Sequence, residues 1–163
     1  MVTASIDPKL LPFLLEVKDP EIPVLNVIEM GIVRSAELTG DTARVTITPT
    51  YSGCPAMHEI ETDIRRGLEK HGIKAVTVEL VHTPAWTTDW LSIEAKEKLR
   101  AYGIAPPGAP ADALVSIGSR ESTPCPYCGS KNTSLRSEFG STACKSLHFC
   151  NGCRQPFEQF KAF

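Results

Sequence analysis

Four of the six cysteines in this 163-residue chain form two Cys-x-x-Cys pairs: Cys125 with Cys128, and Cys150 with Cys153. Each pair lets two sulfur atoms of one tight turn reach the same ion, and two pairs complete a tetrahedron of thiolates. The 21 residues between the pairs leave room for a hairpin. We therefore predict a zinc ribbon in which zinc is structural, because four protein ligands leave no open coordination position. An iron–sulfur site held by the same thiolates is the alternative.

Neighbouring residues extend this prediction. Gly129 and Gly152 are expected where the two turns need a flexible backbone. Cys144, which lies between the pairs, is either a spare thiol or an alternate ligand, and His148 is a weaker candidate ligand. A segment of this size cannot fold on apolar burial alone, so we expect metal binding to supply much of its stability.

A second candidate for sulfur chemistry is Cys54, at the end of the stretch Thr48-Pro49-Thr50-Tyr51-Ser52-Gly53-Cys54-Pro55. A strand pattern runs into this stretch and an amphipathic helix pattern runs out of it, which places Cys54 at a helix entrance. The N–H groups and positive dipole end of that helix favour a thiolate. We therefore expect a partly exposed Cys54 with a pKa below the free-thiol value of about 8.5. The alternative is a small, inert cysteine that only packs.

Two carboxylates, Asp19 and Glu21, flank Pro20 in a turn that the prolines make rigid. They either contribute to a polar site or cap the chain that follows. Spacing alone favours the capping interpretation.

Composition and charge limit the classes of function. No apolar run approaches the roughly 20 residues that span a bilayer, and the first residues lack the pattern of a signal peptide. We therefore expect a cytoplasmic protein with no membrane partner, in which cysteines indicate metal or redox chemistry rather than disulfides. Residues 1–119 carry 11 Lys and Arg against 16 Asp and Glu, whereas residues 120–163 carry 6 against 3. This basic excess is too small to predict a nucleic-acid partner.

Periodic patterns indicate an α+β fold. Residues 31–38 and 43–48 alternate as the strands of a hairpin, and residues 73–81 read as a third strand. Between them, one buried helical stripe is formed by Met57, Ile60, Ile64 and Leu68. We predict a small mixed three-stranded sheet with packed helices, followed by the C-terminal zinc ribbon.

A proline-rich stretch marks the expected division of the chain, since residues 105–111 suit neither a helix nor a central strand. We predict a first domain at residues 1–104, a linker at 105–119 and the zinc ribbon at 120–163.

The order of motifs along the chain resembles a known family. The motifs are Asp19-Pro20-Glu21-Ile22-Pro23-Val24, Gly31-Ile32-Val33, Thr48 to Pro55, Phe139-Gly140-Ser141-Thr142-Ala143-Cys144-Lys145 and Pro156-Phe157. The first three are similar to the small domain of iron–sulfur assembly factors of the SufT type. With the ribbon, the resemblance extends along nearly the whole chain to the D subunits (J in another nomenclature) encoded with bacterial phenylacetyl-CoA ring-1,2-epoxidases. These epoxidases are multicomponent di-iron monooxygenases of aerobic phenylacetate degradation.

The resemblance implies an accessory protein rather than an enzyme. Such a protein assists maturation of the metal centres of the epoxidase, with the iron–sulfur flavoprotein reductase as the expected partner. Cys54 corresponds to the family's cluster-handling thiol, with Asp19 and Glu21 in the neighbouring loop, and would hold iron or a cluster transiently. A structural subunit of the oxygenase complex is the alternative. An enzyme with Cys54 as nucleophile is disfavoured, because the helix carries its candidate base His58 toward a polar face.

Overall fold

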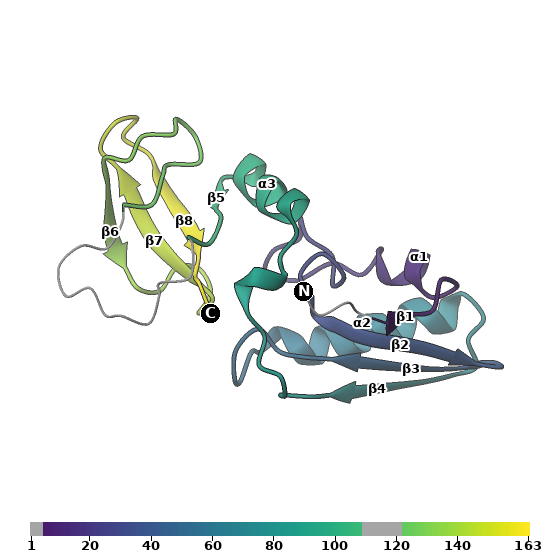
Figure 1. The fold of residues 1–163 in the computed structure, drawn as a ribbon. Coiled ribbons are helices and arrows are strands. Elements are labelled where there is room, and N and C mark those ends of the chain that lie inside the picture. The colour runs from purple at the N-terminus through teal and green to yellow at the C-terminus, as the bar shows by residue number, and fades with distance from the viewer. Residues whose placement is uncertain (1–4, 109–121) are drawn as a thin grey trace. The chain divides into compact units, whose positions relative to one another are not determined.

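The chain forms two compact units, Met1–Ser92 and Ile93–Phe163. The computed structural model describes residues 5–108 and 122–163 (Figure 1). Each unit contains helix and strand, so the predicted α+β class is confirmed. No helix within the described ranges is long and apolar enough to cross a membrane.

The first unit is a four-stranded sheet with one long helix beside it (Figure 1). Its elements are β1 (Ser5–Ile6), α1 (Leu11–Leu14), β2 (Val33–Thr39), β3 (Thr42–Ile47), α2 (Ala56–Lys70), β4 (Ala75–Leu80) and a 3-10 turn (Thr88–Trp90). The order in the sheet is β1-β2-β3-β4, with β2 and β3 antiparallel and the other two pairs parallel. Helix α2 makes the crossover from β3 to its parallel neighbour β4, as a parallel pair requires.

Helix α2 is positioned by its apolar stripe. The buried residues of the helix are Ala56, Met57, Ile60, Ile64 and Leu68, which include all four that the periodicity predicts. Alternate residues of β3, namely Ala43, Val45 and Ile47, are buried as well. Burying each of the large side chains among these contributes about 1.5–3 kcal/mol. Burial of these side chains therefore holds the first residues of α2 in place. Cys54 lies in the turn that leads into this end of the helix.

The predicted number of strands in this sheet is wrong. Strand β1 adds a fourth, because Ser5 and Ile6 pair in parallel with Ser35 and Ala36 of β2. A strand of two residues is too short for an alternating pattern, so periodicity does not reveal it. The sheet is nevertheless mixed, as predicted.

The second unit contains a four-stranded sheet preceded by one helix. Its elements are α3 (Ile93–Tyr102), β5 (Ile104–Ala105), β6 (Thr133–Ser137), β7 (Lys145–Cys150) and β8 (Pro156–Phe160). The order in the sheet is β5-β8-β7-β6, in which β6, β7 and β8 are antiparallel neighbours and β5 is parallel to β8. The small core beneath the strands contains Ala105, Cys125, Cys150 and Phe157.

The structure divides the chain after Ser92, earlier than the expected division after residue 104. Residues 104 and 105 form β5, which pairs with Glu158 and Gln159 of β8. Ala105 was expected to open the linker, but it is 1% exposed in the core of the ribbon unit. Residues 109–119 of that linker lie outside the described part of the chain.

A ribbon fragment that begins at residue 93 should be more stable than one that begins at residue 120. Only the longer fragment retains β5, whose residues Ile104 and Ala105 are 6% and 1% exposed. Exposure of this surface should lower the free energy of unfolding by about 1–3 kcal/mol. Denaturant unfolding of both fragments with the same zinc content measures the difference. Equal stabilities would assign β5 no structural role in the ribbon.

Candidate functional site

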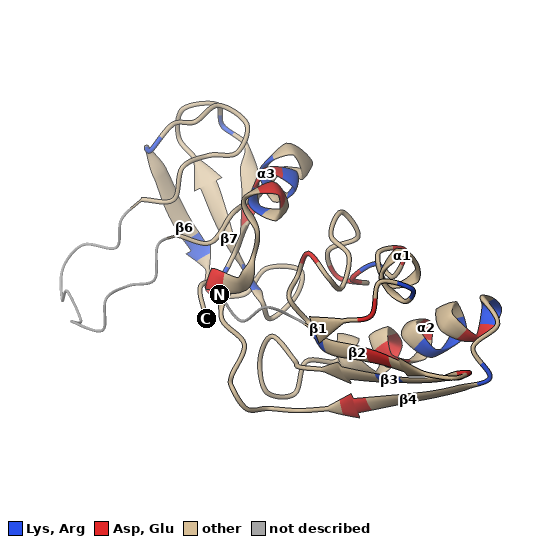
Figure 2. Ribbon diagram, turned by 45° about the vertical axis from the view of Figure 1, so that its right-hand side comes forward, with Lys and Arg blue, Asp and Glu red and all other residues tan. Residues whose placement is uncertain are grey.

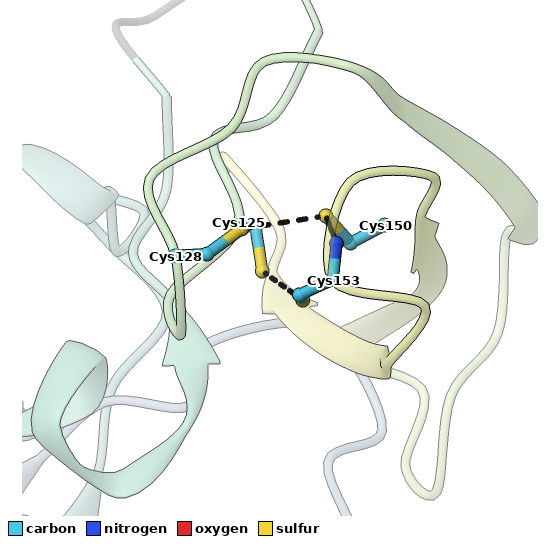
Figure 3. A group of neighbouring side chains, drawn as sticks. All are labelled: Cys125, Cys128, Cys150 and Cys153. Atoms are coloured by element: carbon cyan, nitrogen blue, oxygen red, sulfur yellow. Dashed lines mark hydrogen bonds between the residues drawn. The ribbon is translucent and has the colours of Figure 1, made fainter.

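Two turns bring four cysteine thiols together in the second unit. Their sulfur atoms all lie within 4.8 Å of one another. Figure 3 shows the side chains of Cys125 and Cys128 facing those of Cys150 and Cys153. The sulfur atoms are 3.7 Å apart between Cys125 and Cys153, and 3.6 Å apart between Cys128 and Cys150. The sequence therefore predicted correctly which cysteines gather.

These distances fit one tetrahedral metal ion. Metal–sulfur bonds of about 2.3 Å in a tetrahedron place neighbouring sulfur atoms about 3.8 Å apart. A cluster of several irons separates its thiolate ligands further, because the thiolates bind different iron atoms. The thiol group is therefore suited to a single ion such as zinc, which would crosslink the two turns and leave no position for a substrate.

Two of the four thiols have strongly shifted pKa values. The backbone N–H of Cys153 donates to Cys150 Sγ over 3.4 Å, and this hydrogen bond leads the effects that lower the pKa of Cys150 to about 6. Burial, aided by the neighbouring sulfurs, raises the pKa of Cys153 to about 12. Cys150 thus ionises more readily than an ordinary thiol and Cys153 less readily, and a bound metal ion would favour the thiolate form that coordinates it.

The two turns share one residue with a positive φ and one backbone hydrogen bond, but a different residue type occupies the positive-φ position in each. After the first pair, Gly129 has φ +73° and its N–H donates to Cys125 O over 2.9 Å. After the second, Arg154 has φ +64° and its N–H donates to Cys150 O over the same distance. The expectation for Gly129 is confirmed, but that for Gly152 is wrong. The left-handed conformation falls instead on Arg154, where a side chain costs about 1–2 kcal/mol.

Cys144 and His148 do not join the four thiols. Cys144 is buried, and its sulfur lies 3.0 Å from Thr142 Oγ1. His148 Nε2 shares a 3.0 Å hydrogen bond with Ser146 Oγ, and its ring stacks on Phe157. Both residues therefore have structural partners within the ribbon unit.

Replacement of one thiol of the group should remove the metal and unfold the ribbon. We expect about one zinc per wild-type chain and almost none in Cys150→Ser, whose remaining thiols cannot close the tetrahedron. Cys144→Ser is the matched control and should retain zinc. Elemental analysis and circular dichroism test both variants. Full zinc content in Cys150→Ser would refute the assignment.

In the first unit, the turn between β3 and α2 presents Cys54. Gly53 has φ +81°, a left-handed conformation that favours glycine, and the Cys54 N–H donates to Tyr51 O over 3.2 Å. Pro55 occupies the N-cap position of α2 without a side-chain hydrogen bond, and Met57 N–H donates to Cys54 O over 3.3 Å. Cys54 itself is half-buried, so the predicted partial exposure is confirmed.

The predicted direction of the Cys54 pKa shift is wrong. Burial raises the pKa of this thiol, and the carboxylates of Glu21 and Asp19 raise it further. Hydrogen bonds from the Ala56 backbone and the Thr50 side chain act in the opposite direction but are outweighed. The N-terminal end of α2 is therefore not enough to stabilise a bare thiolate. Thr50 was not singled out from the sequence, although it lies in the same turn.

The loop that carries Asp19 and Glu21 lies close enough to Cys54 to act on its charge. Asp19 is buried, and its Oδ1 accepts hydrogen bonds of 2.8 Å from the N–H groups of both Glu21 and Ile22. The capping interpretation of Asp19 is therefore confirmed. These hydrogen bonds also hold the Asp19 carboxylate in the loop that acts on Cys54. Asp19 can therefore cap the loop and contribute to a polar site at the same time.

Alkylation of Cys54 should be slow at neutral pH and should accelerate beyond the free-thiol pKa of about 8.5, because little thiolate exists below it. Glu21→Gln should increase the rate at pH 7.5, because it removes a charge that opposes ionisation. Glu69→Gln, in the last turn of α2, is the matched control. Mass spectrometry of iodoacetamide labelling against pH measures these rates. A rate that levels off below pH 8 would show that the thiolate is stabilised.

Family comparisons match both parts of the chain. Residues 9–80 match an iron-sulfur cluster assembly protein family, and residues 109–161 match the PaaD zinc beta ribbon domain. A crystal structure of a domain of unknown function from Bacillus anthracis is 29% identical with a TM-score of 0.53, and covers 56% of this chain and 88% of that one. The fold and the four-cysteine group thus define an iron–sulfur assembly domain followed by a metal-binding ribbon.

Relatives identify the family more narrowly. A protein of Escherichia coli K12, named as the D component of 1,2-phenylacetyl-CoA epoxidase, is 46% identical over 90% of this chain and 87% of its own length. An Fe-S protein maturation auxiliary factor of Porphyromonas gingivalis is 39% identical over 51% of this chain and 80% of its own. The chain belongs to the family of phenylacetyl-CoA epoxidase D subunits.

Proposed function

We propose that this chain is an accessory protein of a phenylacetyl-CoA epoxidase system that helps to mature the metal centres of that system. Its client is the iron–sulfur flavoprotein reductase, and its cargo is iron or an iron–sulfur cluster. The observation that carries the proposal is the half-buried Cys54 thiol beside the carboxylates of Asp19 and Glu21. The unit that holds them matches the iron–sulfur cluster assembly family, and one relative is named as a maturation factor.

The surroundings of Cys54 suit reversible binding of a cation. Without cargo the thiol is neutral, because burial and two carboxylates oppose its ionisation. An arriving iron ion is attracted by the same carboxylates and displaces the proton, since the thiolate is the metal ligand. A single sulfur ligand holds the cargo weakly enough to transfer it to a client with a complete ligand set.

The ribbon has a different role, in which zinc bound by Cys125, Cys128, Cys150 and Cys153 is structural. The closed set of four ligands leaves no coordination position for a reacting group. His58, the residue that could act as a base for Cys54, is exposed on α2. We therefore propose a carrier and maturation role without a catalysed reaction.

Cys54→Ser should abolish maturation while leaving the fold intact, because it replaces one sulfur atom by oxygen. When the reductase and oxygenase are produced with this variant, iron and sulfide per reductase should fall to the level found without the chain. Chemical reconstitution of the purified reductase should restore epoxidase activity. The control His58→Ala should support normal maturation.

Normal cluster content with Cys54→Ser would overturn this proposal. If activity then still depended on the chain, and reconstitution did not replace it, the chain would be a structural subunit of the oxygenase complex.

A further inference from the structure

Two arginine side chains converge on one aromatic ring of the ribbon sheet. The guanidinium carbons of Arg136 and Arg154 lie 5.1 Å and 5.8 Å from the ring centre of Phe149. Both arginines are exposed, whereas Phe149 is half-buried on β7. The ring therefore holds two cations at the surface in a defined arrangement.

Arg154 adopts a backbone conformation that its side chain disfavours. Within residues 5–108 and 122–163 it is the one non-glycine residue with positive φ, at +64°. The equivalent position of the first turn is Gly129, which adopts φ +73° without strain. Glycine would thus serve the turn better. A residue with a strained backbone at a position that glycine would fit supports the hypothesis that its side chain has a function.

Arg136 reaches the same ring from an irregular position in β6. The register between β6 and β7 shifts between Leu135 and Ser137, so Arg136 is an extra residue without a cross-strand partner. Such a bulge re-aims a side chain relative to a regular strand. Two unrelated backbone irregularities therefore place both guanidiniums beside Phe149.

The segment that carries Phe149 has an excess of positive charge. Residues 122–163 contain five Lys and Arg against two Glu, and Glu158 pairs with Lys145 over 3.3 Å. Figure 2 shows Lys and Arg on β6 and on the turns near the start of this strand. A guanidinium that lies beside a ring still has N–H groups that can donate to a carboxylate.

We propose that Arg136, Phe149 and Arg154 form a docking surface for an acidic segment of a partner protein. On the function proposed above, that partner is a component of the epoxidase system. Arginines and a partly buried aromatic ring are the residue types that contribute most to protein interfaces. The surface would hold the client through bidentate contacts to its carboxylates, leaving cargo transfer to Cys54.

Nucleic acid fits this surface less well. Single-stranded nucleic acid needs several open aromatic rings for stacking, and here one ring already faces two guanidiniums. Residues 1–92 carry 8 Lys and Arg against 13 Asp and Glu, so the charge of the first unit disfavours a polyanionic partner.

Calorimetry with the full chain and each purified epoxidase component tests the inference. We expect one component to bind, more weakly as salt rises from about 50 to 500 mM. Arg136→Ala and Arg154→Gly should each reduce its affinity about tenfold. Lys131→Ala removes the same charge from an exposed position at the turn before β6, and should change affinity less than about twofold.

Arg154→Gly separates docking from folding. Because glycine tolerates the left-handed backbone, this variant should melt at the same temperature as wild type or higher, so its weaker binding cannot come from unfolding. Wild-type binding that both arginine variants retain would overturn the docking surface and leave the maturation role intact. The docking surface would also be overturned if no epoxidase component bound the wild-type chain. The proposed maturation role is tested separately, by the Cys54→Ser variant. Tighter, Arg154-dependent binding of a single-stranded oligonucleotide would assign the surface to nucleic acid instead.

Discussion

The charge on sulfur is the constraint on which the ribbon depends. The sulfur atoms of four cysteines lie within 4.8 Å of one another, so four thiolates there would repel one another unless a cation lay among them. The ribbon unit has a small core, and two of the cysteines, Cys125 and Cys150, belong to it. A bound metal ion would neutralise the thiolates and join the two turns, so we expect folding of the ribbon to depend on metal binding.

The first unit has one thiol, Cys54, in place of a group of four. The pKa of this single thiol is raised by burial and by the charges of Glu21 and Asp19. A closed set of four ligands suits a permanent structural ion, whereas one thiol beside carboxylates suits an ion that must leave again. This contrast supports separate roles for the two units, with a structural metal in one and transient cargo in the other.

Local patterns in the sequence predicted the features that depend on local spacing. The stripe through Ile60 and Ile64 follows from the helical period, and the four-cysteine group from two tight turns. Features that depend on distant parts of the chain were missed. Strand β5 pairs with β8 across the second unit, which moved the boundary between units. The helix entrance suggested a thiolate at Cys54, but the carboxylates that oppose it come from a loop far upstream. Arg154 could have been noticed, because it stands where the first turn has Gly129.

The central claim is tested most directly by iron analysis of this chain. The chain is produced together with the epoxidase reductase and is then purified away from it without oxygen. If Cys54 carries the cargo, wild-type chain should contain iron in addition to its structural metal, and Mössbauer spectra of 57Fe-labelled samples should show sulfur-ligated iron. The Cys54→Ser chain, purified in the same way, should retain the structural metal and lose this iron. Equal iron in the two chains would contradict a carrier role for Cys54.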